Sequence, residues 1–250
     1  MNNQSKQFIA GLSLLGVLSL TAADSQPRHY TIPTIDLSAQ QHRQVVVDRE
    51  KGQYLGHPTT VLLEDGKTML IVYPKGHGQG GIVYKRSTDG GKTWGKRLPT
   101  PKSWATSREV PTIHRVVDAV GTKRLIMWSG LYPARLAVSE DGGGNWSELK
   151  PAGDWGGIVV MGCLEKVKTG RGHYMAMFHD DGRFFTKSGK LAKPVLFNLY
   201  KTFSKDGGLT WSNPESILAR SDVHLCEPGI IRSPNGKQLC VLLRENSRRK

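Results

Sequence analysis

An eight-residue motif that occurs three times constrains the fold of this 250-residue chain more than any other feature. The copies are STDGGKTW (87–94), SEDGGGNW (139–146) and SKDGGLTW (204–211). All three fit the template Ser-x-Asp-x-Gly-x-Thr-Trp, except that Asn145 replaces the Thr of the other two copies. Near-identical segments along one chain indicate a repeated structural unit, so we expect an array of similar units.

Each copy predicts the turn of a β-hairpin. The Asp-x-Gly pattern is a turn signal, and the segment IVYKR (82–86) before the first copy can form a strand. The Asp side chain can accept backbone N–H groups across the turn, the Gly can take a positive φ, and the Trp ring can pack over the hairpin. We therefore expect Asp89, Asp141 and Asp206 to hold hairpins. Calcium binding is the alternative, but the one or two carboxylates of each copy are too few ligands for that ion.

The motif resembles the Asp-box, or BNR repeat, of sialidases and related six-bladed β-propellers. The resemblance implies an all-β fold in which the boxes lie on the outer rim, away from the active centre. It covers residues 52–250, which we expect to form a sialidase-like β-propeller domain.

The segments between the boxes predict how many blades the chain holds. Residues 56–76, 109–130 and 226–246 share one outline, with a Pro near the start, an apolar strand, a polar turn and a second apolar strand. Residues 156–182 are a longer version without the Pro, so four blades are at least begun. The interval from this Pro to the next box is 29 and then 28 residues, which places the box after Pro228 near residue 256. We therefore expect a six-bladed propeller of which only about four blades are present, as the N-terminal portion of a longer protein.

The start of the chain predicts export. Residues 1–23 combine a polar start containing Lys6, the apolar stretch FIAGLSLLGVLSL and small residues before a cleavage point after Ala23. This is the pattern of a signal peptide, and its apolar stretch is too short to span a bilayer. With no Cys near the cleavage point to carry a lipid, we expect a secreted or periplasmic protein without a membrane span, in which residues 24–51 lead into the propeller.

The charge of the chain indicates the kind of partner. The formal net charge is +14 at pH 7, which favours anionic partners such as acidic glycans, nucleic acid or anionic surfaces. Nucleic acid is the weakest of these, because the chain is expected to be exported and its Lys and Arg residues are scattered, with one tight cluster at 248–250. We expect an acidic glycan or glycoconjugate as the partner, and a monomeric protein.

The three cysteines point to free thiols and not to a metal site. Their odd number leaves at least one of them unpaired within the chain. Cys163 and Cys240 each lie in an apolar run, which predicts buried thiols. No Cys-x-x-Cys pair or His cluster has the spacing of metal ligands, so we expect no metal and no other cofactor.

Polar residues are expected to converge where the inner strands of the blades meet. In a propeller, equivalent strand ends from different blades surround one central channel. The starts of the first strands are at His57, Arg108, Glu109, Gly157 and Glu227. The ends of the second strands are at 73–77, 128–132, 179–181 and 244–245. For a single member such as His57, a solvated loop position is an equal alternative, whereas Glu227 and Arg244 end adjacent strands of one blade and should face the same channel.

The resemblance to sialidases extends to individual residues. That family clamps the sugar carboxylate with three arginines, uses a Tyr nucleophile activated by a Glu, and has an Asp acid/base on a loop of the first blade. The segment CEPGIIRSPNGKQLCVLLREN resembles the family's stretch with the Glu and the second Arg, which correspond to Glu227 and Arg244. The first blade departs from the pattern, because residues 56–58 read Gly-His-Pro instead of Arg-Ile-Pro and the next loop holds Lys75 and His77 but no Asp. The third Arg and the Tyr would lie beyond the last residue of the chain.

These features predict a secreted exo-glycosidase of the sialidase type that hydrolyses a terminal acidic sugar, such as sialic acid, from glycans. Arg244 would hold the sugar carboxylate, Glu227 would activate the nucleophile, and His77, Glu109 or Asp180 would replace the missing acid. The expected catalytic residues are Glu227 and Asp180, and the expected substrate-binding residues are Arg244, His57, Lys75, His77, Arg108 and Glu109. The alternative function is a non-catalytic propeller that binds an acidic glycan. A purely structural adhesion propeller is a third class, and it predicts no convergent polar ring.

Overall fold

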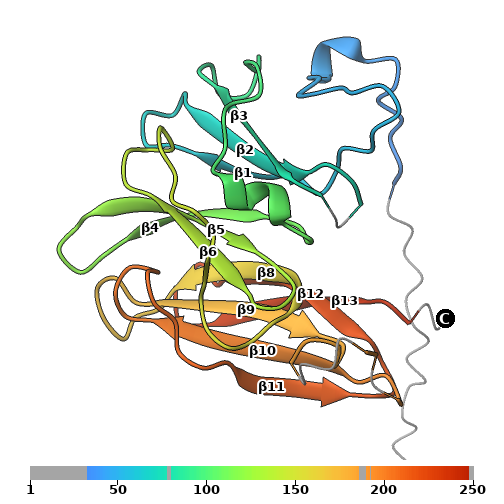
Figure 1. Cartoon of the computed structure of the whole chain (residues 1–250), viewed down its shortest axis with the longest axis vertical. Helices are drawn as coiled ribbons and strands as arrows, with labels where there is room; N and C mark the ends of the chain where they lie inside the picture. Colours follow the sequence, from blue (N-terminus) through green and yellow to red (C-terminus); the bar gives the residue numbers. More distant parts are fainter. Residues whose placement is uncertain (1–32, 78–79, 186–189, 192, 248–250) are drawn as a thin grey trace, which may run out of the picture. The chain divides into compact units, whose positions relative to one another are not determined.

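The computed structural model of the chain contains two units, divided after Arg43 (Figure 1). It describes residues 33–247 other than 78–79, 186–189 and 192, and does not describe the side chains of 158–160. The described part of the first unit contains a short 3-10 helix, η1 (Gln41–Arg43), and the expected signal peptide lies outside the described residues. Within the described residues, no helix is both long and apolar enough to cross a membrane.

The second unit is built from four antiparallel β-sheets. The first sheet contains β1 (Thr59–Leu62), β2 (Met69–Pro74) and β3 (Ile82–Ser87). The second contains β4 (Thr112–Val117), β5 (Lys123–Ser129), β6 (Arg135–Ser139) and β7 (Lys150–Pro151). The third contains β8 (Ile158–Lys166), β9 (Tyr174–Asp180), β10 (Phe197–Ser204) and β11 (Glu215–Arg220). The fourth contains β12 (Leu225–Arg232) and β13 (Leu239–Glu245). A 3-10 helix, η2 (Lys102–Thr106), precedes β4, and the predicted all-β fold with four blades begun is confirmed.

The sheets are arranged as the blades of a partial propeller. Within each sheet the strands pair in the order in which they occur in the chain. The first strands of successive sheets contact each other, β1 with β4, β4 with β8 and β8 with β12. The hydroxyl of Thr59 joins the first two sheets, because it donates to the carbonyl of Pro111 at 3.2 Å and accepts the N–H of Ile113 at 3.1 Å. Sheets joined through their inner strands in this way are the architecture of a β-propeller.

The first box folds as the predicted hairpin turn after β3. The Asp89 carboxylate accepts the N–H of Thr93 at 2.9 Å and its hydroxyl at 2.6 Å. The Ser87 hydroxyl donates to the same carboxylate at 2.7 Å and accepts the N–H of Gly91 at 2.9 Å. Trp94 Nε1 donates to the carbonyl of Gly91 at 3.1 Å, and Gly91 has the predicted positive φ of 87°. The side chains of the box therefore hold the hairpin, as expected.

The second box is tied to the neighbouring blade. Asn145 Nδ2 donates to Asp141 at 2.6 Å, so an amide replaces the Thr hydroxyl of the other copies. The buried Tyr84 of β3 donates its hydroxyl to the carbonyl of Gly143 at 2.7 Å and packs edge-on against Trp146. In the first and third boxes, the equivalent carbonyl accepts the Trp N–H of its own turn. The turn of the second blade thus completes the packing of the first.

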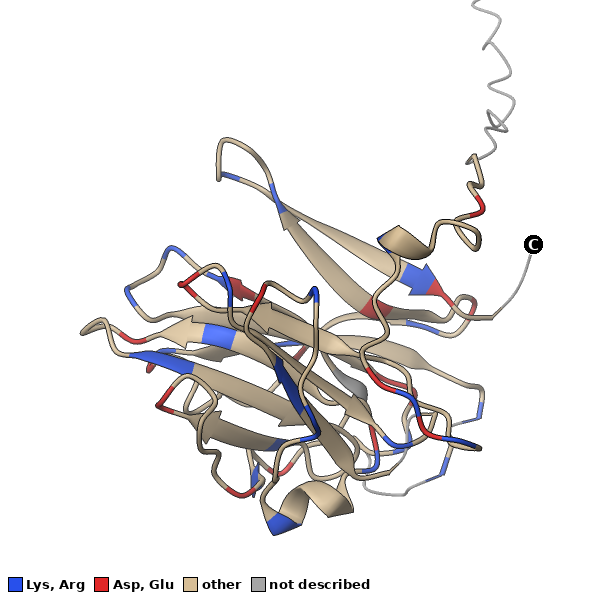
Figure 2. Cartoon of the chain, turned by 90° about the horizontal axis from the view of Figure 1, so that it is seen from above, with Lys and Arg blue, Asp and Glu red and all other residues tan. Residues whose placement is uncertain are grey.

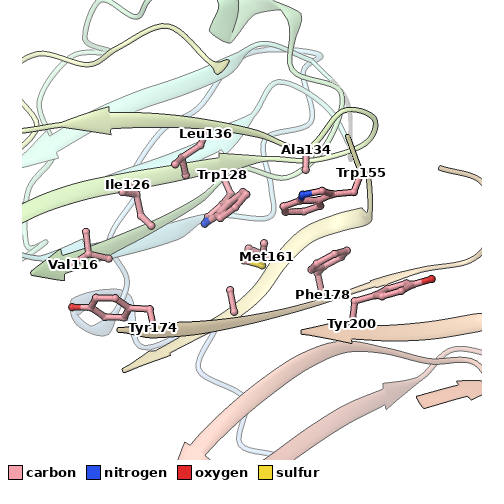
Figure 3. Close-up of a cluster of buried hydrophobic side chains, with 11 residues drawn as sticks. Val116, Ile126, Trp128, Ala134, Leu136, Trp155, Met161, Tyr174, Phe178 and Tyr200 are labelled. Carbon is pink, nitrogen blue, oxygen red and sulfur yellow. The ribbon is translucent and has the colours of Figure 1, made fainter. Parts of the chain in front are cut away.

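Apolar cores between consecutive sheets hold the blades together. The core between the second and third sheets is rich in aromatic rings, and Trp155 stacks on Phe178 with ring centroids 5.1 Å apart (Figure 3). At its edge, the hydroxyl of Tyr174 in β9 accepts the N–H of Val117 in β4 at 2.8 Å. The core between the first and second sheets includes Leu70, Val72, Tyr84, Trp104, Ile113, Leu125 and Met127. Each fully buried side chain of this size contributes about 1.5–3 kcal/mol, so these cores are the main source of attraction between blades.

One expectation about the cysteines is wrong. All three are free thiols, Cys226 is buried and Cys163 is half-buried, but Cys240 is exposed. Exposure alternates along β13, so Cys240 and Leu242 share the more exposed face of the last sheet. An apolar run identifies a strand, but it does not tell which of the two faces of that strand another layer covers.

The positive charge of the chain is spread over strands and loops (Figure 2). Part of it is neutralised locally, as at Arg97, which donates to Asp48 at 2.7 Å and to Glu50 at 2.5 Å. Asp48 also accepts the hydroxyl of Tyr73, so the end of the expected lead-in segment packs on the first sheet.

Candidate functional site

The expected site residues lie at one end of the sheets, where the first strands begin and the second strands end. Several of them form two clusters, one at the fourth sheet and one at the first sheet. The Glu227 cluster comprises Glu227, Arg244 and the end of β9 at His179. The His57 cluster comprises His57, His77 and Tyr54 at the first sheet.

A salt bridge joins Glu227 and Arg244, the two residues that the sequence indicates most strongly as members of a functional site. Arg244 Nη1 donates to Glu227 Oε1 at 2.7 Å. The side chains are 54% exposed for Arg244 and 37% exposed for Glu227, so a ligand can reach the pair from solvent. This contact uses one of the five N–H donors of the guanidinium. Because a guanidinium can bind two oxygens in parallel, Arg244 can hold Glu227 and a ligand oxygen at the same time.

Glu227 occupies a β-bulge in β12. The pairing register with β13 shifts between Cys226 and Gly229, so two residues of β12 stand opposite one of β13. Glu227 has a φ of 51°, a left-handed conformation that costs a residue other than glycine about 1–3 kcal/mol. The next residue, Pro228, has no N–H and therefore loses no ladder hydrogen bond here. The Glu-Pro sequence suits a place where the strand leaves the ladder.

A buried histidine contacts the backbone of this bulge. The N–H of Glu227 donates to Nδ1 of His179 at 3.2 Å, so the neutral imidazole carries its proton on Nε2. Burial lowers the pKa of His179 to about 4, which keeps the ring neutral at pH 7. The ring stacks on Phe197 with centroids 5.8 Å apart, and Phe197 stacks on His224 at 4.6 Å. His179 is therefore a fixed hydrogen-bond acceptor at the Glu227 cluster.

Asp180, an expected catalytic residue, is enclosed by the loop that follows β9. Its side chain is buried and its carboxylate accepts the N–H groups of Gly182, Phe184 and Phe185 at 2.9, 3.4 and 3.2 Å. Burial raises the pKa of Asp180, against the effect of the N–H groups, which favour the ionised form. The neighbouring Asp181 binds Arg183 Nε at 2.9 Å. Both carboxylates shape the loop.

The His57 cluster places two imidazoles in contact. The rings of His57 and His77 have centroids 4.5 Å apart, and Tyr54 lies 5.5 Å from His77, edge-on. Lys75 lies at the same end of β2, where its ammonium is 3.2 Å from Glu50. This group offers polar rings and a cation at the channel end of the first blade.

The backbone at His57 repeats the bulge at Glu227. His57 has a φ of 52° and is followed by Pro58, as Glu227 is followed by a Pro. Between its bridge to Lys75 and its ladder pair with Val72, the first strand again has one residue more than the second. The same local geometry therefore presents a His in the first blade and a Glu in the fourth.

The second blade contributes a less accessible carboxylate. Glu109 is buried, and its Oε1 accepts the N–H of Val110 at 2.9 Å. The hydroxyl of Ser107 donates to the carbonyl of Glu109 at 3.0 Å. Arg108 is exposed. The burial of Arg135 and the nearby positive charge of Arg108 both lower the pKa of Arg135. Two guanidinium groups therefore lie close to each other at this end of the sheet.

The chemistry of these groups suits an anionic ligand. Arg244, Arg108 and Lys75 are cations at strand ends, and they are all at least partly exposed. Among the residues that the structure describes, no group of three or more His, Cys, Asp or Glu side chains is arranged to hold a metal ion.

Two residues of these clusters, His179 and Tyr54, are not assigned a role from the sequence. His179 falls in the expected ring at 179–181, but its contact with Glu227 depends on the bulge, which the sequence does not predict. Tyr54 lies before the first recognised strand, so no repeat position identifies it. The order Gly-His-Pro in the first blade and Cys-Glu-Pro in the fourth was the available signal that the two bulges correspond.

No protein-family model and no curated protein sequence matches the chain. Solved structures do match. A protein of unknown function from Dyadobacter fermentans superposes with a TM-score of 0.53 and 17% identity, over 82% of this chain and 65% of that chain. A thermostable family-43 glycoside hydrolase has the same TM-score with 12% identity, over 81% of this chain and 67% of that chain.

A Trypanosoma rangeli sialidase in complex with sialic acid matches less well, with a TM-score of 0.39 and 14% identity over 77% of this chain and 34% of that chain. At such identities the matches above a TM-score of 0.5 establish the fold and not the activity. The chain spans about two thirds of the length of the first two structures, and it shares with them an all-β fold that here forms a partial propeller.

Proposed function

We propose that this propeller is a secreted, monomeric glycoside hydrolase of the sialidase type that acts on a terminal acidic sugar such as sialic acid. The observation that carries the proposal is the salt bridge between Arg244 and Glu227, because it places an exposed guanidinium beside a carboxylate at the bulge. A guanidinium can bind a sugar carboxylate through two parallel hydrogen bonds, and a carboxylate can accept the proton of an attacking hydroxyl. The fold shared with a family-43 glycoside hydrolase supports a glycan as the ligand, and the net charge of +14 supports an anionic one.

The burial of the side chains suggests how the remaining roles are divided. Of the three acids considered for protonating the leaving group, Glu109 and Asp180 are buried, whereas His77 is exposed and contacts His57. We therefore assign the proton donor to His77 and the shaping of the β9 loop to Asp180. His57, Lys75 and Arg108 complete the substrate-binding set in this proposal.

A second function is favoured by the enclosure of Asp180. Because its carboxylate bonds three backbone N–H groups, the fold uses this acid for structure. A propeller that binds an acidic glycan without cleaving it needs Arg244 and its cationic surroundings, but no acid. Both functions predict binding of an acidic glycan, but only the hydrolase predicts its cleavage.

The binding step is tested by replacing Arg244 with Lys. The change keeps the positive charge but removes the fork, so the affinity for N-acetylneuraminic acid, measured by titration calorimetry, should fall about 10-fold, or about 1.4 kcal/mol. Arg232→Lys is the matched control, because Arg232 lies at the opposite end of the same two-stranded sheet, where it pairs with Glu165 at 2.7 Å. Galactose serves as the neutral ligand. Equal losses in the two variants, or equal affinities for the two sugars, would refute the assignment of the site.

The catalytic step is tested by Glu227→Gln. A neutral amide cannot accept the nucleophile's proton, so cleavage of a fluorogenic sialoside should disappear. Sugar binding should be kept or strengthened, because the change removes a negative charge that repels the carboxylate of the ligand. The assay uses the full-length protein, and binding by that protein without any cleavage would decide for the non-catalytic function.

A further inference from the structure

The bulge at Glu227 takes the backbone N–H of this residue out of the β12–β13 ladder. A backbone N–H that leaves the ladder in a partly buried place must find another acceptor. The N–H of Glu227 finds it in Nδ1 of His179, 3.2 Å away on the neighbouring sheet. The acceptor comes from a different blade, so this hydrogen bond joins the third blade to the salt-bridged carboxylate of the fourth.

The imidazole is held in the orientation that this bond requires. His179 stands opposite Leu199 of β10 in the ladder and is 3% exposed. Its ring lies within 11° of parallel to the ring of Phe197, which in turn lies within 10° of parallel to His224. The stack fixes the plane of the ring, and the hydrogen bond from the Glu227 N–H selects the edge of the ring that carries Nδ1.

We propose that His179 is a positioning residue, whose neutral imidazole accepts the Glu227 N–H and thereby holds the bulge in the conformation that brings Glu227 to Arg244. The inference rests on the proposed function in one respect, since the pair that it positions is the proposed sugar site. The inference is based on a hydrogen bond between two blades, and it predicts that Nδ1 of His179, and not Nε2, is the atom that holds the bulge. Protonation of Nδ1 would remove the acceptor and place a second positive charge near Arg244.

The electrostatic surroundings of His179 are consistent with a neutral ring. Burial lowers its pKa to about 4, so the acceptor is present over the neutral and mildly acidic range and is lost as the pH falls through about 4. The charged and titratable groups around it come from four segments of the chain, and they are Asp181, Arg183, Glu227, Arg244 and, across Phe197, His224.

Two substitutions separate the acceptor from the ring. In His179→Asn, the amide oxygen is as many bonds from Cα as Nδ1 is, so an acceptor stays in place. In His179→Gln, the oxygen is one bond farther, at the distance of Nε2. Both variants lose the stacking on Phe197, so any general destabilisation should be similar in the two.

The experiment measures the affinity of the full chain and both variants for N-acetylneuraminic acid between pH 4 and 8. We expect the Asn variant to bind within about 2-fold of the wild type and the Gln variant to bind about 10-fold more weakly, which corresponds to about 1.4 kcal/mol for one lost hydrogen bond. Wild-type affinity should fall towards pH 4, and that of the Asn variant should fall less. Equal losses in both variants, or no loss in either, would overturn the positioning role.

Nuclear magnetic resonance of the same proteins keeps the test independent of the sugar. In the wild type, the nitrogen signals of His179 should show a proton on Nε2 and none on Nδ1, and a proton on Nδ1 would overturn the proposal even if the Gln variant does not fold. The amide signal of Glu227 and the guanidinium signals of Arg244 should be retained in the Asn variant and displaced in the Gln variant. If the wild type binds no acidic sugar, the proposed function fails, and these signals alone decide on the positioning role.

Discussion

Replacing Gly143 by alanine should destabilise the protein more than replacing Gly142, although the two glycines are neighbours in the same turn. Both have a positive φ, 69° at Gly142 and 86° at Gly143, so an alanine at either position is strained by about 1 kcal/mol. The positions differ in what a new methyl group would meet. At Gly142 the nearest atom is a methyl carbon of Leu63 at 3.7 Å, an ordinary contact.

At Gly143 the methyl group would enter the packing between the first two blades. It would lie 2.6 Å from a methyl carbon of Leu70 and closer still to the hydroxyl of Tyr84, which donates to the Gly143 carbonyl. Forcing an extra carbon into a packed core costs about 1–3 kcal/mol. Gly143→Ala should therefore cost about 2–4 kcal/mol in all, against about 1 kcal/mol for Gly142→Ala.

The comparison is made by denaturant unfolding of the full chain followed by tryptophan fluorescence, with thermal unfolding as a second measurement. For a domain of this size, the expected difference of about 1–3 kcal/mol corresponds to about 2–12 °C in Tm. If the two variants are equally stable, the second box does not pack against the first blade as described. A larger loss for Gly142→Ala would refute the reasoning outright.

Three further predictions concern the same scaffold. Tyr84→Phe removes the hydroxyl that binds the second box and should cost about 1 kcal/mol, or about 2–4 °C in Tm, while sugar binding stays unchanged. Hydrogen bonds from Asn145 lower the pKa of Asp141 to about 2, so the ionised carboxylate stabilises the fold above pH 4 and this stabilisation is lost as the pH falls towards 2. In acid unfolding, the Asp141→Asn variant should be less stable than the wild type at pH 7. Its free energy of unfolding should fall less than that of the wild type between pH 4 and 2. With a thiol reagent under native conditions, the exposed Cys240 should react first, because burial raises the pKa of Cys163 to about 12; mass spectrometry showing Cys163 labelled first would contradict this.

Much of the fold could be predicted because its signals are local. The turn of each box depends on side chains within a few residues of one another, as between Asp89 and Thr93, so the motif is sufficient to predict it. The pairing of Glu227 with Arg244 was also predictable, because both flank one hairpin and the hairpin brings its ends together. The wrong expectation for Cys240 has the opposite cause, since burial depends on which layer covers a strand face.

The site depends more on non-local contacts, which a repeat pattern does not reveal. Whether a carboxylate at a strand end faces solvent is decided by the loop that follows, and at Asp180 that loop folds back over the side chain. The acceptor for the Glu227 N–H comes from another blade, 48 residues away along the chain. A bulge shifts such partners by one position, and a count of residues from the nearest box therefore does not find them.

The order of the strands has a consequence for how the protein is made. Every sheet pairs strands that are neighbours in sequence, so each blade can form its hydrogen bonds soon after its strands leave the ribosome. Tyr84, however, finds its partner 59 residues later, in the box of the second blade. A newly made blade therefore keeps one apolar flank open until the next blade arrives, and synthesis from the N-terminus sets the sequence in which these flanks are closed. On the ribosome, protection of the first blade from proteolysis should rise only once the chain has been extended past the second box.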